Sequence, residues 1–189
     1  MKKFKLSIIL PCYNEENNIL ASFKVVLRSL KTSKIKNFEI IFVDDGSEIP
    51  INKDIKENEY VKIISNDRNY GYGYSIKKAV NSAKYDLIGI IDSDNSYDLN
   101  FLIKELKTFD ENKIDMIVGK RKFNYNEGFL RKTYRFFLNK FSSMIFNFKI
   151  EDINSGIRLF KKDLFLDNKK YFPDRFSITS TQTLTYIVK

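Results

Sequence analysis

The chain alternates between short apolar runs and segments in which apolar residues recur every three or four positions. Unbroken apolar runs are typical of strands buried on both faces, and the wider spacing indicates amphipathic helices. The runs predict strands over 6–10, 38–43, 61–65, 87–91 and 114–118, and the spacing predicts helices over 15–31, 76–83, 102–109 and 129–148. This order predicts an α/β fold with a Rossmann-like, mainly parallel sheet and helices on both faces.

The domain organisation follows from the same pattern. The chain has 189 residues, 43% of them hydrophobic, and neither a repeat nor a linker-like stretch divides it. We therefore expect a single domain over 1–189.

The composition narrows the chemistry. His is absent and Cys12 is the single cysteine, so His-based nucleophilic catalysis, His-ligated zinc and a disulfide framework are excluded. Acid–base or metal chemistry must therefore rest mainly on carboxylates.

The net charge of +9 favours an anionic partner, such as a nucleotide, a nucleic acid or a phospholipid. Eight basic residues and one acid, Glu127, lie within 120–149. The sequence has no secretory signal and no apolar run near the eighteen or so residues that span a bilayer. We expect a cytoplasmic protein, either free or peripheral at the cytoplasmic face of the membrane.

Polar side chains follow three of the predicted strands, and ligands of such sheets bind beyond the carboxyl ends of the strands. Asp92 and Asp94 follow the fourth strand, and alternate residues of an extended chain point the same way. Two carboxylates at one point are stable around a hard cation, so the pair predicts a Mg²⁺ or Mn²⁺ site. The alternative is a polar turn.

Two further strand ends carry candidate ligands of a nucleotide. Asp44 and Asp45 can accept hydrogen bonds from a base or a ribose, although Asp-Asp-Gly-Ser is also a common turn sequence. Tyr13 can stack on a base, and Asn14 can cap the next helix. We interpret the Gly71–Gly73 stretch as a flexible turn near the site.

The segment 129–148 places apolar side chains at helical spacing in a basic surrounding. The stripe consists of Leu130, Tyr134, Phe137, Phe141, Ile145 and Phe148. This pattern is typical of a helix on an anionic membrane surface and equally of a core-facing helix with a basic solvent face.

Taken together, six ordered motifs resemble family 2 glycosyltransferases of the GT-A fold, and within them the dolichol-phosphate mannose synthase-like and polyprenyl-phosphate glycosyltransferase branch. The motifs are SIILPCYNEE (7–16), IFVDDGS (41–47), NYGYG (69–73), DSDNSYD (92–98), GKR (119–121) and DINSGIR (152–158). Three features depart from the branch pattern. Ser96 replaces a Gln, Thr181–Gln182 replaces an acidic pair, and a usual basic stretch does not follow before Lys189.

The resemblance implies a role for each matching residue. Pro11, Tyr13 and Glu15 line the nucleotide pocket, with Asp44 or Asp45 on the base. Asp92 and Asp94 hold the metal and the diphosphate, and Arg121 faces the diphosphate or the acceptor phosphate. Asp152 and Arg158 lie where the acceptor meets the sugar. The domain is then a catalytic domain, either naturally short or lacking its C-terminal end.

The implied reaction is inverting transfer from a GDP- or UDP-sugar to a polyprenyl phosphate, with an anionic membrane surface as a further partner and no nucleic acid. One alternative is a sugar-hydroxyl acceptor in polysaccharide or glycolipid synthesis, for which Asp152 is the candidate general base. Another is a non-catalytic basic module that binds nucleic acid or membrane.

Overall fold

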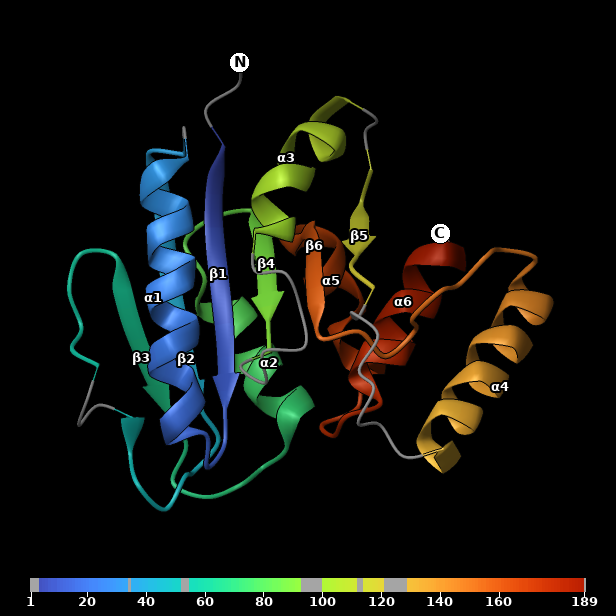
Figure 1. The fold of residues 1–189 in the computed structure, drawn as a ribbon, viewed down its shortest axis with the longest axis horizontal. Coiled ribbons are helices and arrows are strands. Elements are labelled where there is room, and N and C mark those ends of the chain that lie inside the picture. The colour runs from blue at the N-terminus through green and yellow to red at the C-terminus, as the bar shows by residue number, and fades with distance from the viewer. Residues whose placement is uncertain are drawn as a thin grey trace.

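The computed structural model describes residues 4–33, 35–51, 55–92, 100–111, 114–120 and 129–188. Strands and helices alternate through most of the chain (Figure 1). The strands are β1 (Lys5–Cys12), β2 (Asn37–Asp44), β3 (Val61–Ser65), β4 (Leu87–Ile91), β5 (Met116–Val118) and β6 (Ile157–Lys161). The helices are α1 (Glu16–Thr32), α2 (Tyr72–Ser82), α3 (Phe101–Glu111), α4 (Phe129–Phe146), α5 (Lys162–Asn168), the 3₁₀ turn η2 (Lys169–Tyr171) and α6 (Ile178–Val188).

The six strands form one sheet in the order β3-β2-β1-β4-β6-β5. The pairs β1–β2, β2–β3 and β1–β4 are parallel, whereas β6 runs antiparallel to both β4 and β5. The predicted α/β class with a mainly parallel sheet is confirmed.

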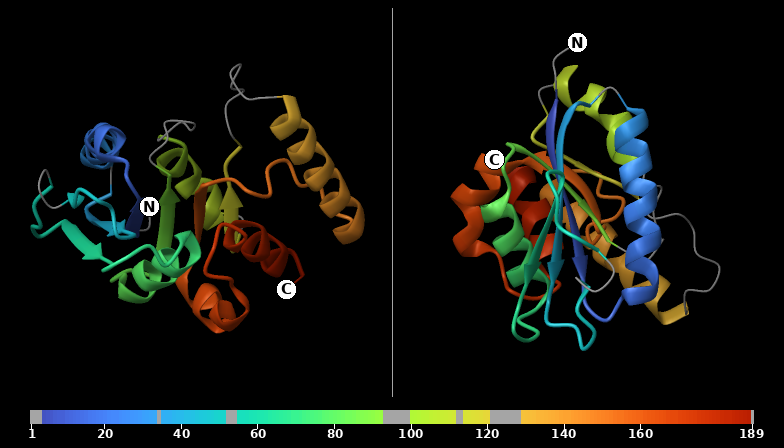
Figure 2. Two further views of the ribbon diagram at one scale, coloured as in Figure 1. Left: turned by 90° about the horizontal axis from the view of Figure 1, so that it is seen from below. Right: turned by 90° about the vertical axis from the view of Figure 1, so that its left-hand side faces the viewer.

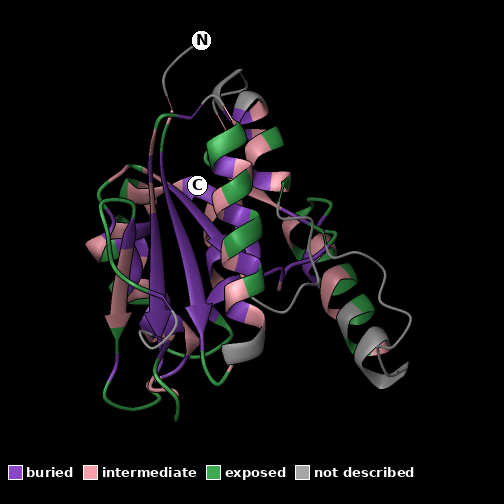
Figure 3. Cartoon of the chain, turned by 60° about the vertical axis from the view of Figure 1, so that its left-hand side comes forward, coloured by how far each residue is buried: buried purple, intermediate pink, exposed green. Residues whose placement is uncertain are grey.

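Both faces of the sheet are covered, because successive strand residues point to opposite sides. Leu6, Ile8 and Leu10 of β1 belong to a core cluster with α1 and α3, whereas Ile9 belongs to a second cluster with α2, α5 and α6. The buried strands between these two layers are visible in Figure 3.

The five predicted strands are present, but β6, α5 and α6 were not predicted. Arg158 interrupts the apolar run of β6, and four threonines and a serine obscure any apolar stripe in α6. Helix α4 lies at one end of the molecule beside α6, not over the sheet (Figure 2). No helix within the described residues is long and apolar enough to cross a membrane.

Candidate active site

A cavity of about 370 Å³ opens at the carboxyl ends of β1, β2 and β4. We call it the strand-end cavity. It is lined by Pro11, Cys12, Tyr13, Glu15, Val43, Asp45, Asn69, Gly71, Tyr72, Ser75, Asp92, Arg175 and Phe176. The structure therefore brings five of the sequence-predicted site residues together, namely Pro11, Tyr13, Glu15, Asp45 and Asp92.

Asp45 fixes the 66–75 segment at the wall of this cavity by hydrogen bonds. One of its oxygens accepts hydrogen bonds from Asn66 Nδ2, Tyr70 N and Ser75 Oγ at 2.8–3.0 Å, and the other accepts one from Gly71 N at 2.8 Å. Each carboxylate oxygen has about two acceptor positions, so the bonds saturate the first oxygen, Oδ1, whereas the second, Oδ2, keeps one position. A contact between Asp45 and a nucleobase would use Oδ2.

Asp44 lies outside the lining of the cavity. It is buried, and one oxygen accepts hydrogen bonds from Ser47 N at 2.9 Å and Ser47 Oγ at 2.6 Å. This is the turn geometry that Asp-Asp-Gly-Ser also predicted.

The loop after β1 is fixed to the same turn. Asn14 has a left-handed φ of 54°, its backbone N–H donates to Ser47 Oγ at 2.9 Å, and its Oδ1 accepts from Glu48 N at 3.0 Å. Asn14 therefore does not cap α1, whose N-cap residue is Glu15. The adjacent Tyr13 lines the cavity with 47% of its surface exposed, which leaves its ring accessible for stacking on a base.

Asp92, directly after β4, has a position fixed from two sides. The Tyr72 hydroxyl donates to its Oδ1 at 2.9 Å, and its Oδ2 lies against Gly156, where a β-carbon would overlap the carboxylate. A fixed carboxylate at a cavity wall fits the hard oxygen ligands of Mg²⁺ or Mn²⁺. Asp94, the second predicted ligand, and Arg121 lie outside the described residues.

A second cavity of about 560 Å³ lies along β5, between the 148–152 segment and α6. We call it the edge cavity. Its polar lining includes Lys120, Lys149, Glu151, Asp152 and Tyr186. Lys149 Nζ forms an ion pair with Glu151 Oε1 at 2.8 Å. Lys149 and Lys120 together hold the pKa of the Glu151 carboxyl below its usual value. Burial raises the pKa of the Tyr186 hydroxyl.

The turn 152–156 links the edge cavity to a residue of the strand-end cavity. Asp152 lines the edge cavity and is 7% exposed, whereas Gly156 contacts Asp92, which lines the strand-end cavity. The turn is closed by a hydrogen bond from Ser155 N to Asp152 O at 3.3 Å. Asp152 therefore lies four residues from the contact with Asp92.

Arg158 is fully buried and lines neither cavity. Its guanidinium donates to Ser155 O and Ile153 O at 2.8 and 3.0 Å, and to Thr179 O and Thr183 Oγ1 at 2.7 and 3.0 Å. This network joins the turn 152–156 to α6. These bonds hold the turn 152–156 in position, and the implied place of Arg158 where the acceptor meets the sugar stays a prediction.

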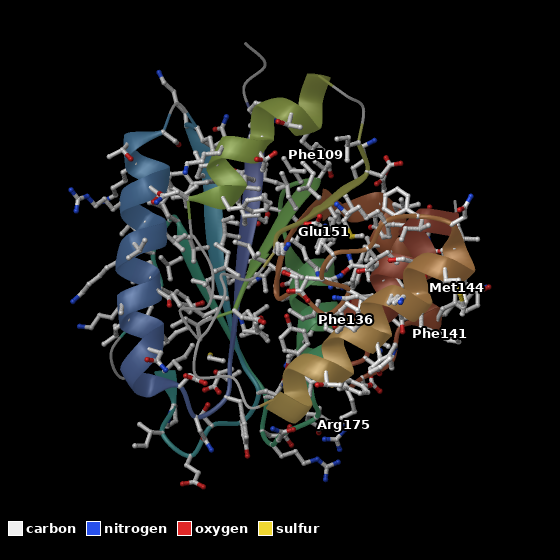
Figure 4. The ribbon with its side chains drawn as sticks, turned by 45° about the vertical axis from the view of Figure 1, so that its right-hand side comes forward. Phe109, Phe136, Phe141, Met144, Glu151 and Arg175 are labelled. Carbon is white, nitrogen blue, oxygen red and sulfur yellow. The ribbon has the colours of Figure 1, made fainter. Side chains whose placement is uncertain are left out.

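Helix α4 turns Asn139 and Ser143 toward the 150–153 segment and most of its described aromatic side chains outward. Asn139 Nδ2 donates to Glu151 O at 2.8 Å, and Asn139 Oδ1 accepts from Ile153 N at 3.1 Å. Ser143 Oγ accepts from Ile150 N at 2.9 Å. The exposed apolar face consists of Tyr134, Phe136, Phe137, Phe141, Met144 and Ile145 of α4 and of the adjoining Phe148, each at least 56% exposed. Figure 4 shows Phe141 and Met144 on the side away from the sheet. The core-facing interpretation of this stripe is wrong for the described side chains.

Four side chains of the strand-end cavity were not predicted from the sequence, namely Tyr72, Ser75, Arg175 and Phe176. Tyr72 and Phe176 stack with ring centroids 5.5 Å apart, although 104 positions separate them along the chain. In the sequence, the glycines at 71 and 73 are the signal for the close approach of the 173–175 segment.

The family model of glycosyl transferase family 2 matches residues 7–168, so the chain belongs to that family. The chain is 27% identical over 166 residues to an undecaprenyl-phosphate 4-deoxy-4-formamido-L-arabinose transferase of Proteus mirabilis, covering 85% of this chain and 50% of that protein. It is 29% identical over 175 residues to a prophage bactoprenol glucosyl transferase homolog of Escherichia coli, covering 90% and 56%. It thus spans about half the length of these relatives.

Solved structures share the fold. S. aureus TarS superposes with a TM-score of 0.69 at 23% identity, covering 98% of this chain and 56% of that one. Glucosyl-3-phosphoglycerate synthase of Mycobacterium tuberculosis, crystallised with Mn²⁺, UDP and phosphoglyceric acid, superposes with a TM-score of 0.67 at 17% identity, covering 95% and 63%. The predicted GT-A architecture is confirmed by these neighbours.

Proposed function

We propose that the chain is the catalytic domain of an enzyme that transfers a sugar from a nucleotide-diphosphate sugar to a polyprenyl phosphate. The observation that carries the proposal is the fixed Asp92 carboxylate at the wall of the strand-end cavity. The family and the polyprenyl-phosphate substrates named for the relatives support it.

The donor would lie in the strand-end cavity with its base near Tyr13 and its diphosphate near Asp92. Asp92, with Asp94 two residues later, would hold Mg²⁺ or Mn²⁺. When bound, the cation would neutralise the charge that develops on the leaving diphosphate. Tyr72 and Gly156 would keep the Asp92 oxygens in position before the donor arrives. The donor is a UDP- or a GDP-sugar.

Transfer would be a single inverting displacement. An oxygen of the acceptor phosphate forms a bond to the anomeric carbon while the bond from that carbon to the diphosphate breaks. The nucleoside diphosphate leaves with the electron pair. A phosphate is already anionic at neutral pH, so a general base is not required and the enzyme must mainly orient the two reactants.

A sugar hydroxyl is the second candidate acceptor, favoured by Asp152 in the edge cavity. A hydroxyl must lose its proton during attack, and with His absent from the chain a carboxylate is the natural base. Asp152 lies on the turn whose other end contacts Asp92.

A lipid acceptor requires access to a membrane surface, and the apolar face of α4 is suited to one. Seven large apolar side chains are exposed along it, and the exposed Lys140 and Lys149 flank it. Aromatic side chains beside lysines fit an anionic bilayer interface. The enzyme would bind peripherally at the cytoplasmic face.

The test is transfer from radiolabelled UDP-glucose, UDP-N-acetylglucosamine or GDP-mannose to undecaprenyl phosphate, with an alkyl glycoside, which offers sugar hydroxyls, as the comparison. Lipid-linked sugar formed only with the phosphate supports the first acceptor. Product formed only with hydroxyl compounds would replace it with the second.

A further inference from the structure

The segment 172–176, between η2 and α6, is fixed against the start of α2. Asp174 O accepts a hydrogen bond from Tyr74 N at 3.0 Å, and the Asp174 carboxylate forms an ion pair with Lys77. Lys77 also donates to Phe172 O at 3.0 Å. Backbone and side-chain bonds together therefore set the course of this segment.

Two glycines make the approach possible. A β-carbon on Gly71 would lie 2.6 Å from Asp174 O and 2.9 Å from Arg175 Cδ, and one on Gly73 would overlap Pro173 O. Most of these neighbours are backbone atoms, which cannot shift cheaply. The Gly71–Gly73 stretch, interpreted above as a flexible turn, is the surface on which the segment packs.

This packing places Arg175 and Phe176 at the strand-end cavity. Phe176 stacks on Tyr72, whose hydroxyl binds Asp92. The side chains that line the cavity include three carboxylates, of Glu15, Asp45 and Asp92, and one cation, that of Arg175. Figure 4 shows Arg175 at this end of the molecule.

We infer that Arg175 binds the diphosphate of the nucleotide-sugar, an inference that rests on the proposed function. A guanidinium presents forked N–H donors that match phosphate oxygens, and its charge offsets the repulsion between a diphosphate and the carboxylates of the cavity. The contact of Arg175 Cδ with Gly71 limits how far the side chain can turn away.

The test is isothermal titration of wild type, Arg175→Ala, Arg175→Lys and Lys170→Ala with UDP, GDP and the corresponding nucleosides in the presence of Mn²⁺. Lys170 is the matched control, because it lies five residues earlier against the Tyr171 ring and outside the cavity lining. Arg175→Ala should weaken binding of the diphosphate by roughly tenfold or more. It should leave the nucleoside unchanged, Arg175→Lys should be intermediate, and Lys170→Ala should match wild type.

Equal diphosphate affinity in wild type and Arg175→Ala would overturn the inference and leave the proposed function standing. An equal loss of nucleoside binding would also overturn it, because it would show a change in the cavity itself. Failure of the wild type to bind either diphosphate would overturn both the inference and the proposed function.

Discussion

The carboxylate of Asp92 lies directly against the α-carbon of Gly156, so that a β-carbon at residue 156 would overlap Asp92 Oδ2 and Cγ. The backbones are also joined, since Asp92 N donates to Gly156 O at 3.3 Å. Gly156→Ala should therefore displace the carboxylate from the strand-end cavity. We expect Mn²⁺-dependent nucleotide binding to fall by roughly tenfold or more, measured by titration at two metal concentrations.

Gly89→Ala is the control for this variant. A β-carbon there would meet the side-chain ends of Ile8 and Leu102 at 2.7 and 2.8 Å, away from Asp92. It should lower the melting temperature and leave nucleotide affinity unchanged. Equal affinities for Gly156→Ala and wild type would show that the position of Asp92 does not matter.

Replacement of the buried Arg158 should lower the stability of the folded protein and not only its catalytic rate. Replacing it with Met leaves the buried Ser155 O, Ile153 O and Thr179 O without their guanidinium donor. We expect a loss of roughly 2–5 kcal/mol in the free energy of unfolding, measured in urea, because each buried acceptor left without a donor costs about 1–3 kcal/mol. Lys161→Met, on the same strand, removes a half-exposed ion pair with Asp115 and should cost less than about 1 kcal/mol. Similar losses for the two variants would contradict the positioning role.

The exposed face of α4 predicts binding to anionic vesicles. Phe137→Ser with Phe141→Ser should weaken sedimentation with phosphatidylglycerol vesicles by roughly tenfold or more, since a fully buried aromatic side chain contributes about 1.5–3 kcal/mol. The melting temperature should stay close to that of wild type, because these rings are 62% and 59% exposed. Tyr171→Ser, an exposed aromatic outside α4, is the control. A double variant that melts far below wild type would mean that the face packs against protein.

The variant Asp152→Asn distinguishes the two candidate acceptors, a sugar hydroxyl and a lipid phosphate. With a hydroxyl acceptor, Asp152→Asn should lower turnover by roughly two to four orders of magnitude, the usual contribution of a general base. The rise of the wild-type rate with pH should also disappear. With a lipid phosphate the loss should be smaller and independent of pH, and nucleotide binding should persist in both cases. Wild-type turnover of the variant on both acceptors would remove Asp152 from the mechanism.

The local pattern of apolar and polar residues was sufficient to predict most strands of the sheet. The limits of β3 and β4 agree with prediction, because polar residues bound both apolar runs. β6 could not be predicted, because the buried Arg158 needs partners on α6 that no local window contains.

The candidate site was predictable at the residues that follow β1, β2 and β4, namely Pro11, Tyr13, Glu15, Asp45 and Asp92. Asp92 and Asp45 follow strands and therefore reach the carboxyl edge, but the four hydrogen bonds that position Asp45 come from residues 66–75. Arg175 approaches through a loop distant in sequence. The orientation of α4 could not be predicted either, because Asn139 and Ser143 form their hydrogen bonds with the 150–153 segment, outside the helix.

The most direct test of the proposed function is transfer of labelled sugar from a nucleotide-sugar to undecaprenyl phosphate by wild type, Asp92→Asn and Asp94→Asn, each with Mn²⁺ or with EDTA. Wild type should form the lipid-linked sugar with Mn²⁺ and lose that activity in EDTA. Both variants should be inactive or nearly so while keeping the wild-type melting temperature. Undiminished transfer by Asp92→Asn, or by wild type in EDTA, would contradict the assignment of Asp92 as the ligand of a catalytic metal.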